Sequence, residues 1–395
     1  MAERKTRIRL FNVKFSPNLG DGLLSECLEQ AMTESGCDAS GTYSVDLSGR
    51  TQYSRGTSAR STVLKVLDRL PAFLRPIATA LPRQAMVMGK WRPHYERHLE
   101  GADAIAVGGG NLFTDMDLNF PIKVSNALDL AAGKKLPAAI YGVGVSSKWS
   151  ATGVRIMRAS LAKAKPAYVS VRDAASKSHF DRLFADAAGR QALIVRDPGL
   201  MIGRFAPERM PGSGRGLGLC ITSSVAIRYH SAEAIEDGEL GLWYIALCKA
   251  VAKRGERIVA FTNGSPEDED FLDTIEDRLR EASVTGFERR RPDTPNELVA
   301  LISAFSCLVA HRMHAVIAAV SLGVPVFALL WDEKVEAFME SVGMSDSTAF
   351  VRTGNEDEVA DRILSLAQAP LGYDRAGLID EAFLHARGLY AALAR

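Results

Sequence analysis

The alternation of apolar and polar stretches along the chain predicts a succession of buried strands and amphipathic helices. The clearest case is a pair of short apolar runs, residues 307–310 and 326–330, on either side of a longer apolar stretch at helical spacing, residues 313–322. Gly323 and Pro325 separate that stretch from the second run, as is common where helices end. The pattern predicts a strand–helix–strand unit.

The same rhythm recurs in both halves of the chain. Strands are expected at residues 8–13, 103–107, 138–142, 168–171 and 193–195, and then at 217–221, 258–261, 307–310 and 326–330. Helices are expected at residues 22–35, 121–132, 151–163 and 174–184, and then at 240–254, 268–281, 296–304, 313–322, 335–342, 356–367 and from about 378. This alternation favours an α/β fold with two facing Rossmann-like domains, parallel sheets flanked by helices, and a central cleft, as in GT-B glycosyltransferases.

A segment rich in proline and glycine divides the chain. Residues 206–216 form the predicted linker between an N-terminal domain, 1–205, and a C-terminal domain, 217–372, and residues 373–395 are predicted to form a terminal helix. A length of 395 residues also suits two domains better than one.

Residues 50–100 interrupt the α/β rhythm and are predicted to be a basic insertion. Between Arg55 and His98, nine Lys and Arg residues face only Asp68 and Glu96, which gives a net charge of +7. Apolar residues and prolines are interleaved with these charges. Two interpretations stay open: a basic amphipathic segment that lies on an anionic membrane surface, or a helical insertion with a solvated basic face.

Composition excludes several other classes. The whole chain has a net charge of +1, so no global field directs it toward nucleic acid. Its five cysteines are scattered without a CxxC pair, as is typical of buried thiols in a reducing compartment. Neither a membrane-spanning run nor a signal-peptide core is found in the sequence. We therefore expect a cytoplasmic protein, and the basic insertion leaves open a peripheral position at the inner face of the cell membrane.

Candidate chemistry is concentrated at the turn that follows residues 307–310. His311, Arg312 and His314 lie there, and Lys334 occupies the equivalent turn one strand later. Ligands of open parallel sheets bind outside the carboxyl ends of strands. A guanidinium and an imidazole beside a helix N-terminus form an anion site, so we expect a small substrate with several negative charges. A histidine at a strand end can also be structural, and His311 is the candidate for a capping role.

A polar turn near the start of the chain is the first candidate of the N-terminal half. Asn18, Gly20 and Asp21 follow the first predicted strand, and Asp21 is placed as the N-cap of the next helix. The turn is either a simple helix start or a place where Asn18 or Asp21 binds a sugar hydroxyl.

Two further candidates follow predicted strands of the same half. Gly109, Gly110 and Asn111 end the strand at 103–107, where successive glycines can form an anion-binding nest or only a tight turn. Arg172 ends the strand at 168–171 and either points toward the cleft or pairs with Asp173.

Taken in order, these motifs resemble the polysaccharide pyruvyl transferase family between about residues 8 and 345. The resemblance is carried by Asn18-x-Gly20-Asp21, Gly108-Gly109-Gly110-Asn111-Leu112, Tyr141-Gly142-Val143-Gly144, Ser170-Val171-Arg172-Asp173, Arg312-x-His314-Ala315, Gly323-Val324-Pro325 and Lys334-Val335. It implies transfer of a pyruvyl group from phosphoenolpyruvate to two hydroxyls of a sugar. The product would be a pyruvate ketal on a cell-surface polysaccharide, an exopolysaccharide or its lipid-linked precursor, with release of phosphate.

The resemblance also implies roles for individual residues. Arg312 and Lys334 would bind the phosphate and carboxylate of the donor in the C-terminal domain, and His314 would be the catalytic acid. The family places a functional arginine at Arg172. The acceptor side would be the N-terminal domain, where Asn18, Asp21, Gly109, Gly110 and Asn111 are the candidates for substrate binding. Phosphoenolpyruvate is the co-substrate, and neither another cofactor nor a metal is expected.

Two alternatives stay beside this hypothesis. A GT-B nucleotide-sugar glycosyltransferase is the first, because the segment from His314 to Pro325 is similar to the nucleotide-binding helix of those enzymes. In them a carboxylate five residues before the glycine holds the ribose, whereas this chain has Ala318. The second is a non-catalytic component of a polysaccharide-synthesis complex. Asp268-Glu269-Asp270 is interpreted as an acidic helix start and not as a metal site.

Overall fold

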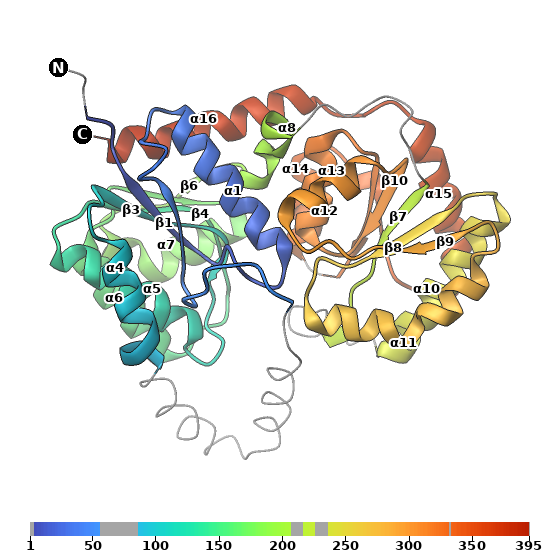
Figure 1. Ribbon diagram of the computed structural model, residues 1–395, viewed down its shortest axis with the longest axis horizontal. Helices are drawn as coiled ribbons and strands as arrows, with labels where there is room; N and C mark the ends of the chain where they lie inside the picture. The colour runs from blue at the N-terminus through green and yellow to red at the C-terminus, as the bar shows by residue number, and fades with distance from the viewer. Residues whose placement is uncertain (1–3, 56–85, 207–215, 226–235, 332, 395) are drawn as a thin grey trace, which may run out of the picture.

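Two parallel sheets lie side by side in the computed structural model, each covered by helices on both faces (Figure 1). The model describes residues 4–55, 86–206, 216–225, 236–331 and 333–394. The predicted α/β class with two Rossmann-like domains is therefore confirmed. Strands that are covered on both faces need continuous apolar runs, and this explains why the strands were recognisable as such runs in the sequence.

The first sheet has six parallel strands. Their order is β2 (Tyr43–Asp46), β1 (Ile8–Asn12), β3 (Ala104–Phe113), β4 (Ala138–Val145), β5 (Tyr168–Val171) and β6 (Leu193–Ile194). The helices of this part of the chain are α1 (Leu19–Glu34), α4 (Arg92–His98), α5 (Asn119–Gly133), α6 (Ala151–Ala164), α7 (Ala174–Ala188) and α8 (Ile202–Phe205). Short π and 3-10 segments, Val87–Trp91 and Pro198–Met201, precede α4 and α8.

The second sheet also has six parallel strands. Their order is β12 (Thr348–Phe350), β11 (Val326–Leu330), β10 (Cys307–Ala310), β7 (Leu217–Cys220), β8 (Ile258–Phe261) and β9 (Phe287–Arg289). Its helices are α10 (Asp237–Lys253), α11 (Pro266–Ala282), α12 (Pro295–Ser303), α13 (Met313–Leu322), α14 (Glu333–Ser341) and α15 (Glu356–Gln368). Strands β10, β7 and β8 are neighbours, so the turns that follow them lie at the same edge of the sheet.

One apolar core runs through both domains. It includes Leu24 of α1 in the first domain and Ile317 of α13 in the second. Gly199 lies between these two side chains, because a Cβ at that position would be 2.7 Å from Leu24 and 2.8 Å from Ile317. A continuous apolar interface of this kind restricts the motion of one domain against the other.

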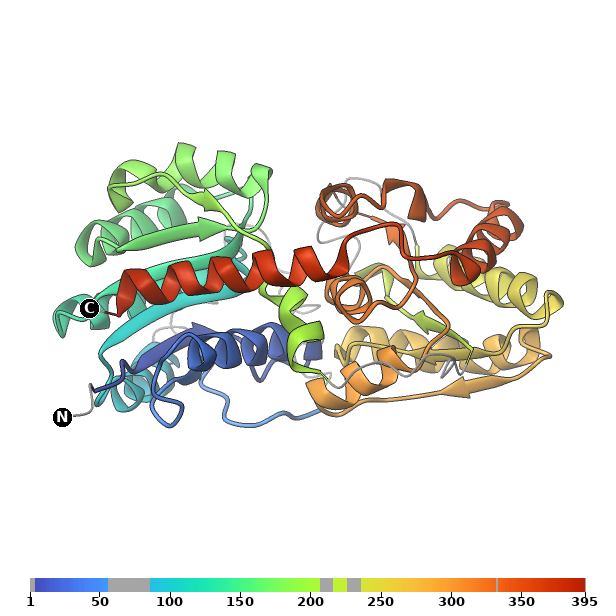
Figure 2. The same ribbon diagram turned by 90° about the horizontal axis from the view of Figure 1, so that it is seen from above.

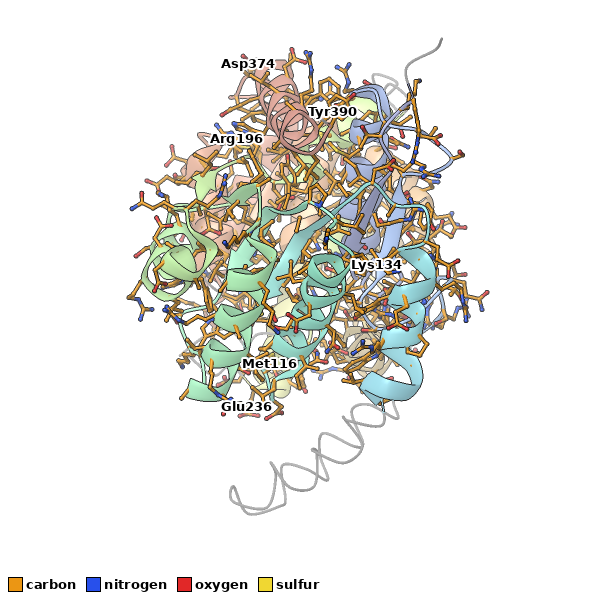
Figure 3. All side chains as sticks on the ribbon, turned by 90° about the vertical axis from the view of Figure 1, so that its left-hand side faces the viewer. Met116, Lys134, Arg196, Glu236, Asp374 and Tyr390 are labelled. Atoms are coloured by element: carbon orange, nitrogen blue, oxygen red, sulfur yellow. The ribbon has the colours of Figure 1, made fainter. Side chains whose placement is uncertain are left out.

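The last helix, α16 (Arg375–Leu393), packs against the first domain although it follows the second in sequence (Figure 2). It buries Ile379, Ala386 and Leu393, and the carboxylate of Glu381 accepts a hydrogen bond from Arg196 at 2.8 Å. Figure 3 shows Tyr390 on this helix and Arg196 near it, at the opposite end of the first domain from Met116. The helix thus joins the domains on a second side.

Three sequence expectations are answered by the secondary structure. The helix at 313–322 and the strand at 326–330 have the predicted bounds. The strand expected to end at residue 107 instead continues to Phe113, so the glycines at 108–110 are inside a strand with an irregular register.

Most of the linker, 207–215, and of the basic insertion, 56–85, lies outside the described residues, so the membrane contact stays a prediction. None of the described helices combines the length and apolar content that a membrane span requires.

Candidate active site

The N-terminus of α1 brings polar residues of the first domain against the second. Asn18, not Asp21, is the N-cap: its side-chain oxygen accepts a hydrogen bond from the backbone N–H of Gly20 at 3.1 Å. The expected cap at Asp21 was wrong, and Asp21 lies in the first helical turn. The backbone N–H of Leu19 donates to the carbonyl oxygen of Asn263, in the turn after β8, at 2.7 Å. The start of α1 is therefore fixed to the second domain.

His314 of α13 packs directly against this turn. A Cβ at Gly20 would be 2.4 Å from Cβ of His314 and 2.5 Å from its Nδ1, so only glycine allows the contact. The Nδ1 atom of His314 lies 3.8 Å from Oδ1 of Asp21, and the two side chains are 12% and 19% exposed. An imidazole and a carboxylate from different domains thus lie side by side with limited access to water.

Burial favours the neutral form of both side chains, so the pKa of the carboxylate rises and the pKa of the imidazole falls. It raises the pKa of Asp21 from 3.8 to about 6, although Ser16, Arg50 and Arg312 act against this shift. Burial, together with the positive charges of Arg172 and Arg312, lowers the pKa of His314 from 6.5 to about 3. Near pH 7 the pair is a neutral imidazole beside a carboxylate that can accept a proton.

The glycines of β3 lie on the other side of Asp21. Gly109 and Gly110 have φ angles of 81° and 85°, in the left-handed region that favours glycine. A Cβ at Gly110 would be 3.8 Å from Oδ1 of Asp21, so this backbone also borders the carboxylate. The side-chain oxygen of Asn111 is buried and has no hydrogen-bond partner within the described residues. An unpaired buried acceptor of this kind is often satisfied by water or by a ligand.

Arg172 follows β5 and is almost fully buried, with 4% of its side chain exposed. Its Nε lies 3.5 Å from Asp173 and its Nη1 lies 3.8 Å from Oδ2 of Asp197. The predicted proximity to Asp173 is confirmed, and the charge of Arg172 also lowers the pKa of His314. That Arg172 points toward a cleft stays a prediction. Asp173 has a structural task as well: its Oδ1 caps α7 through the N–H of Ser176.

Asp197 is a residue of this cluster that the sequence reasoning missed. It follows β6 and caps a short helical turn through the N–H of Gly199 at 2.9 Å. Within the described part of the chain, its Oδ2 has no hydrogen-bond partner and only the long contact with Arg172. Burial raises its pKa, and the positive charge of Arg172 opposes this. The available signal was an Asp-Pro pair directly after a predicted strand, which is a common way to start a helix.

Arg312 has a partner that was not expected. Its Nε and Nη2 both donate to Oδ2 of Asp268, at 2.8 and 2.5 Å. Asp268 lies in the first turn of α11, so the interpretation of this acidic run as a helix start is confirmed, and its side chain is fully buried. Asp268 thus occupies the Nε and Nη2 edge of the guanidinium, and Nη1 has no partner among the described residues; the expected bidentate grip on a substrate, through Nη1 and the second hydrogen of Nη2, stays a prediction.

The second domain holds two further candidates, His311 and Lys334. His311 is buried, and its Nδ1 lies 2.7 Å from the hydroxyl of Tyr244, so it is a core residue and not the helix cap. Burial and the charge of Arg312 lower the pKa of His311 to about 3. Arg312 is the N-cap of α13, and its side chain does not hydrogen-bond the helix end. Lys334 lies half-buried in the first turn of α14, which follows β11 beside β10.

His94 and His98 of α4, in the first domain, have the i, i+4 spacing of a metal-binding pair. His94 and His98 have ring centroids 4.6 Å apart, and Nδ1 of His98 lies 3.2 Å from the hydroxyl of Tyr43. Within the described ranges there is no group of three or more His, Cys, Asp and Glu side chains that could hold a metal ion.

A known protein family matches most of this chain. Residues 18–333 match the family model described as polysaccharide pyruvyl transferase, which is well over half of the sequence. The chain belongs to the polysaccharide pyruvyl transferase family. No curated protein matches the sequence. The matched segment includes every site residue considered above except Lys334, which follows its last residue.

Solved structures with a similar fold include two UDP-GlcNAc 2-epimerases. A UDP-GlcNAc 2-epimerase of Methanocaldococcus jannaschii has a TM-score of 0.55 and 12% identity, with 98% of this chain and 99% of that chain covered. A UDP-GlcNAc 2-epimerase of Neisseria meningitidis has a TM-score of 0.53 and 13% identity, with 98% and 100% covered. At these identities the likeness shows that this pyruvyl transferase family member has the GT-B-like fold.

Proposed function

We propose that this protein transfers a pyruvyl group from phosphoenolpyruvate to two hydroxyls of a saccharide that forms part of a cell-surface or exopolysaccharide or its lipid-linked precursor. The observation that carries the proposal is the meeting of His314 and Asp21 across the domain interface, within the field of Arg172 and Arg312. Membership of a transferase family supports the reaction class.

The donor carries a phosphate and a carboxylate, and the site supplies positive groups for both. The N-terminus of α13 has no capping side chain, so its backbone N–H groups and the positive end of the helix dipole are available to an anion. Nη1 of Arg312 and the guanidinium of Arg172 add full charges. Lys334, at the start of the neighbouring α14, is proposed to bind the second anionic group of the donor.

The proposed reaction forms two C–O bonds at C2 of phosphoenolpyruvate and breaks the bond between C2 and the bridging oxygen. The methylene carbon takes one proton and becomes the methyl group of the ketal. The acceptor hydroxyls lose two protons. One accounts for the proton gained by the methylene carbon, and the other leaves with inorganic phosphate. The route passes through an oxocarbenium-like species, so a proton donor beside the methylene carbon is required.

His314 and Asp21 are proposed to move these protons. The neutral imidazole of the empty site is a poor acid, but a bound multiply charged donor would raise the pKa of His314 again. Asp21 is proposed as the base on an acceptor hydroxyl, because its pKa of about 6 leaves it ionised and moderately basic near neutral pH. Asp173 fits this task less well, since it already caps α7.

Unpaired polar atoms of the first domain support acceptor binding there. Within the described residues, Asn111 Oδ1, Arg172 Nε and Asp197 Oδ2 are buried without hydrogen-bond partners. Asn111 Oδ1 would be 2.7 Å and Arg172 Nη2 3.0 Å from a Cβ at Gly144, so these groups surround a position that has no side chain. Sugar hydroxyls both donate and accept hydrogen bonds, which suits such a mixed set.

A nucleotide-sugar glycosyltransferase is the other function that this fold would support. Against it stands Ala318, at the position where a carboxylate would hold a ribose: its side chain is apolar and fully buried in the core. No polar group at this point of α13 is available to a nucleotide.

The direct test measures inorganic phosphate released from phosphoenolpyruvate in the presence of candidate saccharides that carry free hydroxyl pairs. We expect release that depends on the saccharide, and a raised melting temperature with phosphoenolpyruvate but not with UDP or GDP. Stabilisation by a nucleoside diphosphate without any phosphate release would favour the glycosyltransferase. A protein that responds to neither would match a non-catalytic component.

A further inference from the structure

Asp268 joins three strand ends of the second sheet. It lies in the first turn of α11, after β8, and its Oδ1 accepts hydrogen bonds from the backbone N–H and hydroxyl of Ser223, after β7, at 2.9 and 3.1 Å. Its Oδ2 accepts both hydrogen bonds from Arg312, after β10. One buried carboxylate thus receives four hydrogen bonds from the turns of two neighbouring strands.

This arrangement fixes the orientation of the Arg312 guanidinium. An arginine side chain loses much rotamer freedom when it binds a ligand, and this loss weakens binding unless the side chain is already held in place. Asp268 holds the Nε and Nη2 edge, and Nη1 has no partner among the described residues. The arginine is therefore ordered before any anion arrives, with the edge formed by Nη1 and the second hydrogen of Nη2 still available.

We propose that Asp268 is a positioning residue for the donor site: it holds Arg312 in the orientation that binds the donor anion. The proposal rests on the proposed function, in which that anion belongs to phosphoenolpyruvate. Asp268 itself would not touch the substrate. Groups held by buried supporting hydrogen bonds of this kind are the ones that keep a binding geometry within a fraction of an ångström.

The opposite role, a latch that competes with the substrate for Arg312, fits the contacts less well. A latch must move away when the ligand binds. Oδ1 of Asp268 is bound to Ser223 twice, and the backbone N–H of Asp268 donates to the carbonyl oxygen of Ser265 at 3.0 Å at the start of α11. The two roles predict opposite effects of removing the charge, so one substitution separates them.

The experiment measures dissociation constants of phosphoenolpyruvate and of inorganic phosphate for the full-length protein by calorimetry. We expect Asp268→Asn to weaken both by about 10- to 100-fold, which is the usual cost of losing a charged hydrogen bond. Asp270→Asn is the matched control, since Asp270 is exposed on the same helix, and should bind within about twofold of the wild type. Unchanged or tighter binding in Asp268→Asn would overturn the proposal.

A double-mutant cycle tests whether Asp268 acts through Arg312. Arg312→Ala should weaken anion binding, and adding Asp268→Asn to it should cause little further loss. Equal losses in both backgrounds would mean that Asp268 acts independently of the arginine, which contradicts the proposal. In turnover, Asp268→Asn should raise KM for phosphoenolpyruvate more than it lowers kcat, whereas a general structural defect would lower the active fraction and leave KM unchanged.

Ser223→Ala keeps the test decisive if Asp268→Asn does not fold. It removes only the hydroxyl bond to Oδ1 and should weaken phosphate binding by about two- to fivefold. Wild-type binding in Ser223→Ala would then overturn the proposal.

The two proposals fail in different ways. Phosphate binding that depends on Asp268 without any turnover of phosphoenolpyruvate would remove the function and keep the positioning role. Turnover with an unchanged KM in Asp268→Asn would keep the proposed function and remove the positioning role. A wild-type protein that binds neither phosphoenolpyruvate nor phosphate would overturn both proposals.

Discussion

The Nδ1 atom of His314 lies 3.8 Å from the Oδ1 atom of Asp21, although the two residues belong to different domains. The helices that carry them, α13 and α1, contact each other through the apolar core that contains Ile317 and Leu24. Because that core is continuous across the interface, the two side chains are kept together by the fold. The relationship gives the first prediction, which concerns the imidazole.

His314→Gln should abolish transfer while leaving the protein folded. Glutamine is similar in size and polar, but it does not exchange a proton near neutral pH, and a positioned acid contributes about 10²- to 10⁴-fold to a rate. Phosphate release from phosphoenolpyruvate should fall by at least ~100-fold. The melting temperature without ligand serves as the folding control. A rate within a few-fold of the wild type would remove His314 from the chemistry.

Gly20→Ala should separate His314 from Asp21. The added methyl would be 2.4 Å from Cβ of His314, so the imidazole or the start of α1 must shift. We expect a loss of about 1–3 kcal/mol in the free energy of unfolding, as for other overpacked sites, and a larger relative loss of turnover. Chemical denaturation and phosphate release measure the two effects.

Gly133→Ala is the matched control for that substitution. Gly133 is also within a helix, α5, and a Cβ there would have no neighbour within 4 Å. Alanine favours the helical conformation over glycine, so stability should be equal or slightly higher and turnover unchanged. If Gly20→Ala behaved in the same way, the close packing of Gly20 against His314 would be refuted.

Arg172 and Asp197 should be energetically coupled. Both side chains are almost fully buried, with exposures of 4% and 3%, and their charges lie 3.8 Å apart. Removing Arg172 leaves the Asp197 carboxylate buried without its counter-charge, and removing Asp197 leaves Arg172 with Asp173 alone. Breaking a buried pair typically costs about 3–5 kcal/mol. Asp197→Asn should therefore destabilise the wild type but be nearly neutral or favourable in an Arg172→Ala background. Additive effects in urea unfolding would show that no coupling exists.

The strand–helix–strand unit that contains His314 was predictable because its signals are local. An apolar run, a helical run ended by Gly323 and a second apolar run determine the bounds of β10, α13 and β11 without help from distant residues. The end of β3 was not predictable in this way. Its glycines signal a turn, yet pairing with β4 keeps them in the sheet. That choice depends on a neighbouring strand, not on the local sequence.

The site residues also divide into those with a local signal in the sequence and those whose place depends on distant parts of the chain. His314, Arg172 and Asp21 were recognisable because polar residues at strand ends and helix starts are exceptions within an apolar pattern. The pairing of Arg312 with Asp268 was not recognisable in the sequence. Asp268 lies within an acidic run, and such a run usually marks only the start of a helix. Its burial results from the adjacency of β7, β8 and β10, and the order of strands in a sheet is not written in any one segment.

Asp21 and His314 should make stability depend on pH with opposite signs, because burial raises the pKa of the first and lowers that of the second. Asp21 has a pKa of about 6 in the folded protein and about 4 when unfolded, so between these values the folded state binds the proton and the unfolded state does not. Stability contributed by this group is therefore lost as the pH rises from 4 to 6. The Asp21→Asn variant has no titrating group at this position, so its stability should not fall for this reason between pH 4 and 6. Relative to the wild type, its free energy of unfolding should increase by about 1–3 kcal/mol between pH 4 and pH 7.

His314→Gln supplies the control with the opposite sign. The pKa of His314 is about 3 when folded and 6.5 when unfolded, so the unfolded state binds the extra proton and stability is lost as the pH falls from 6.5 toward 3. This variant should gain on the wild type toward pH 4, where Asp21→Asn has its smallest advantage. Urea unfolding of the three proteins at pH 4, 5.5 and 7 measures both slopes. Parallel stability curves would mean that neither group has a shifted pKa, and the assignment of Asp21 as the base would lose its electrostatic support.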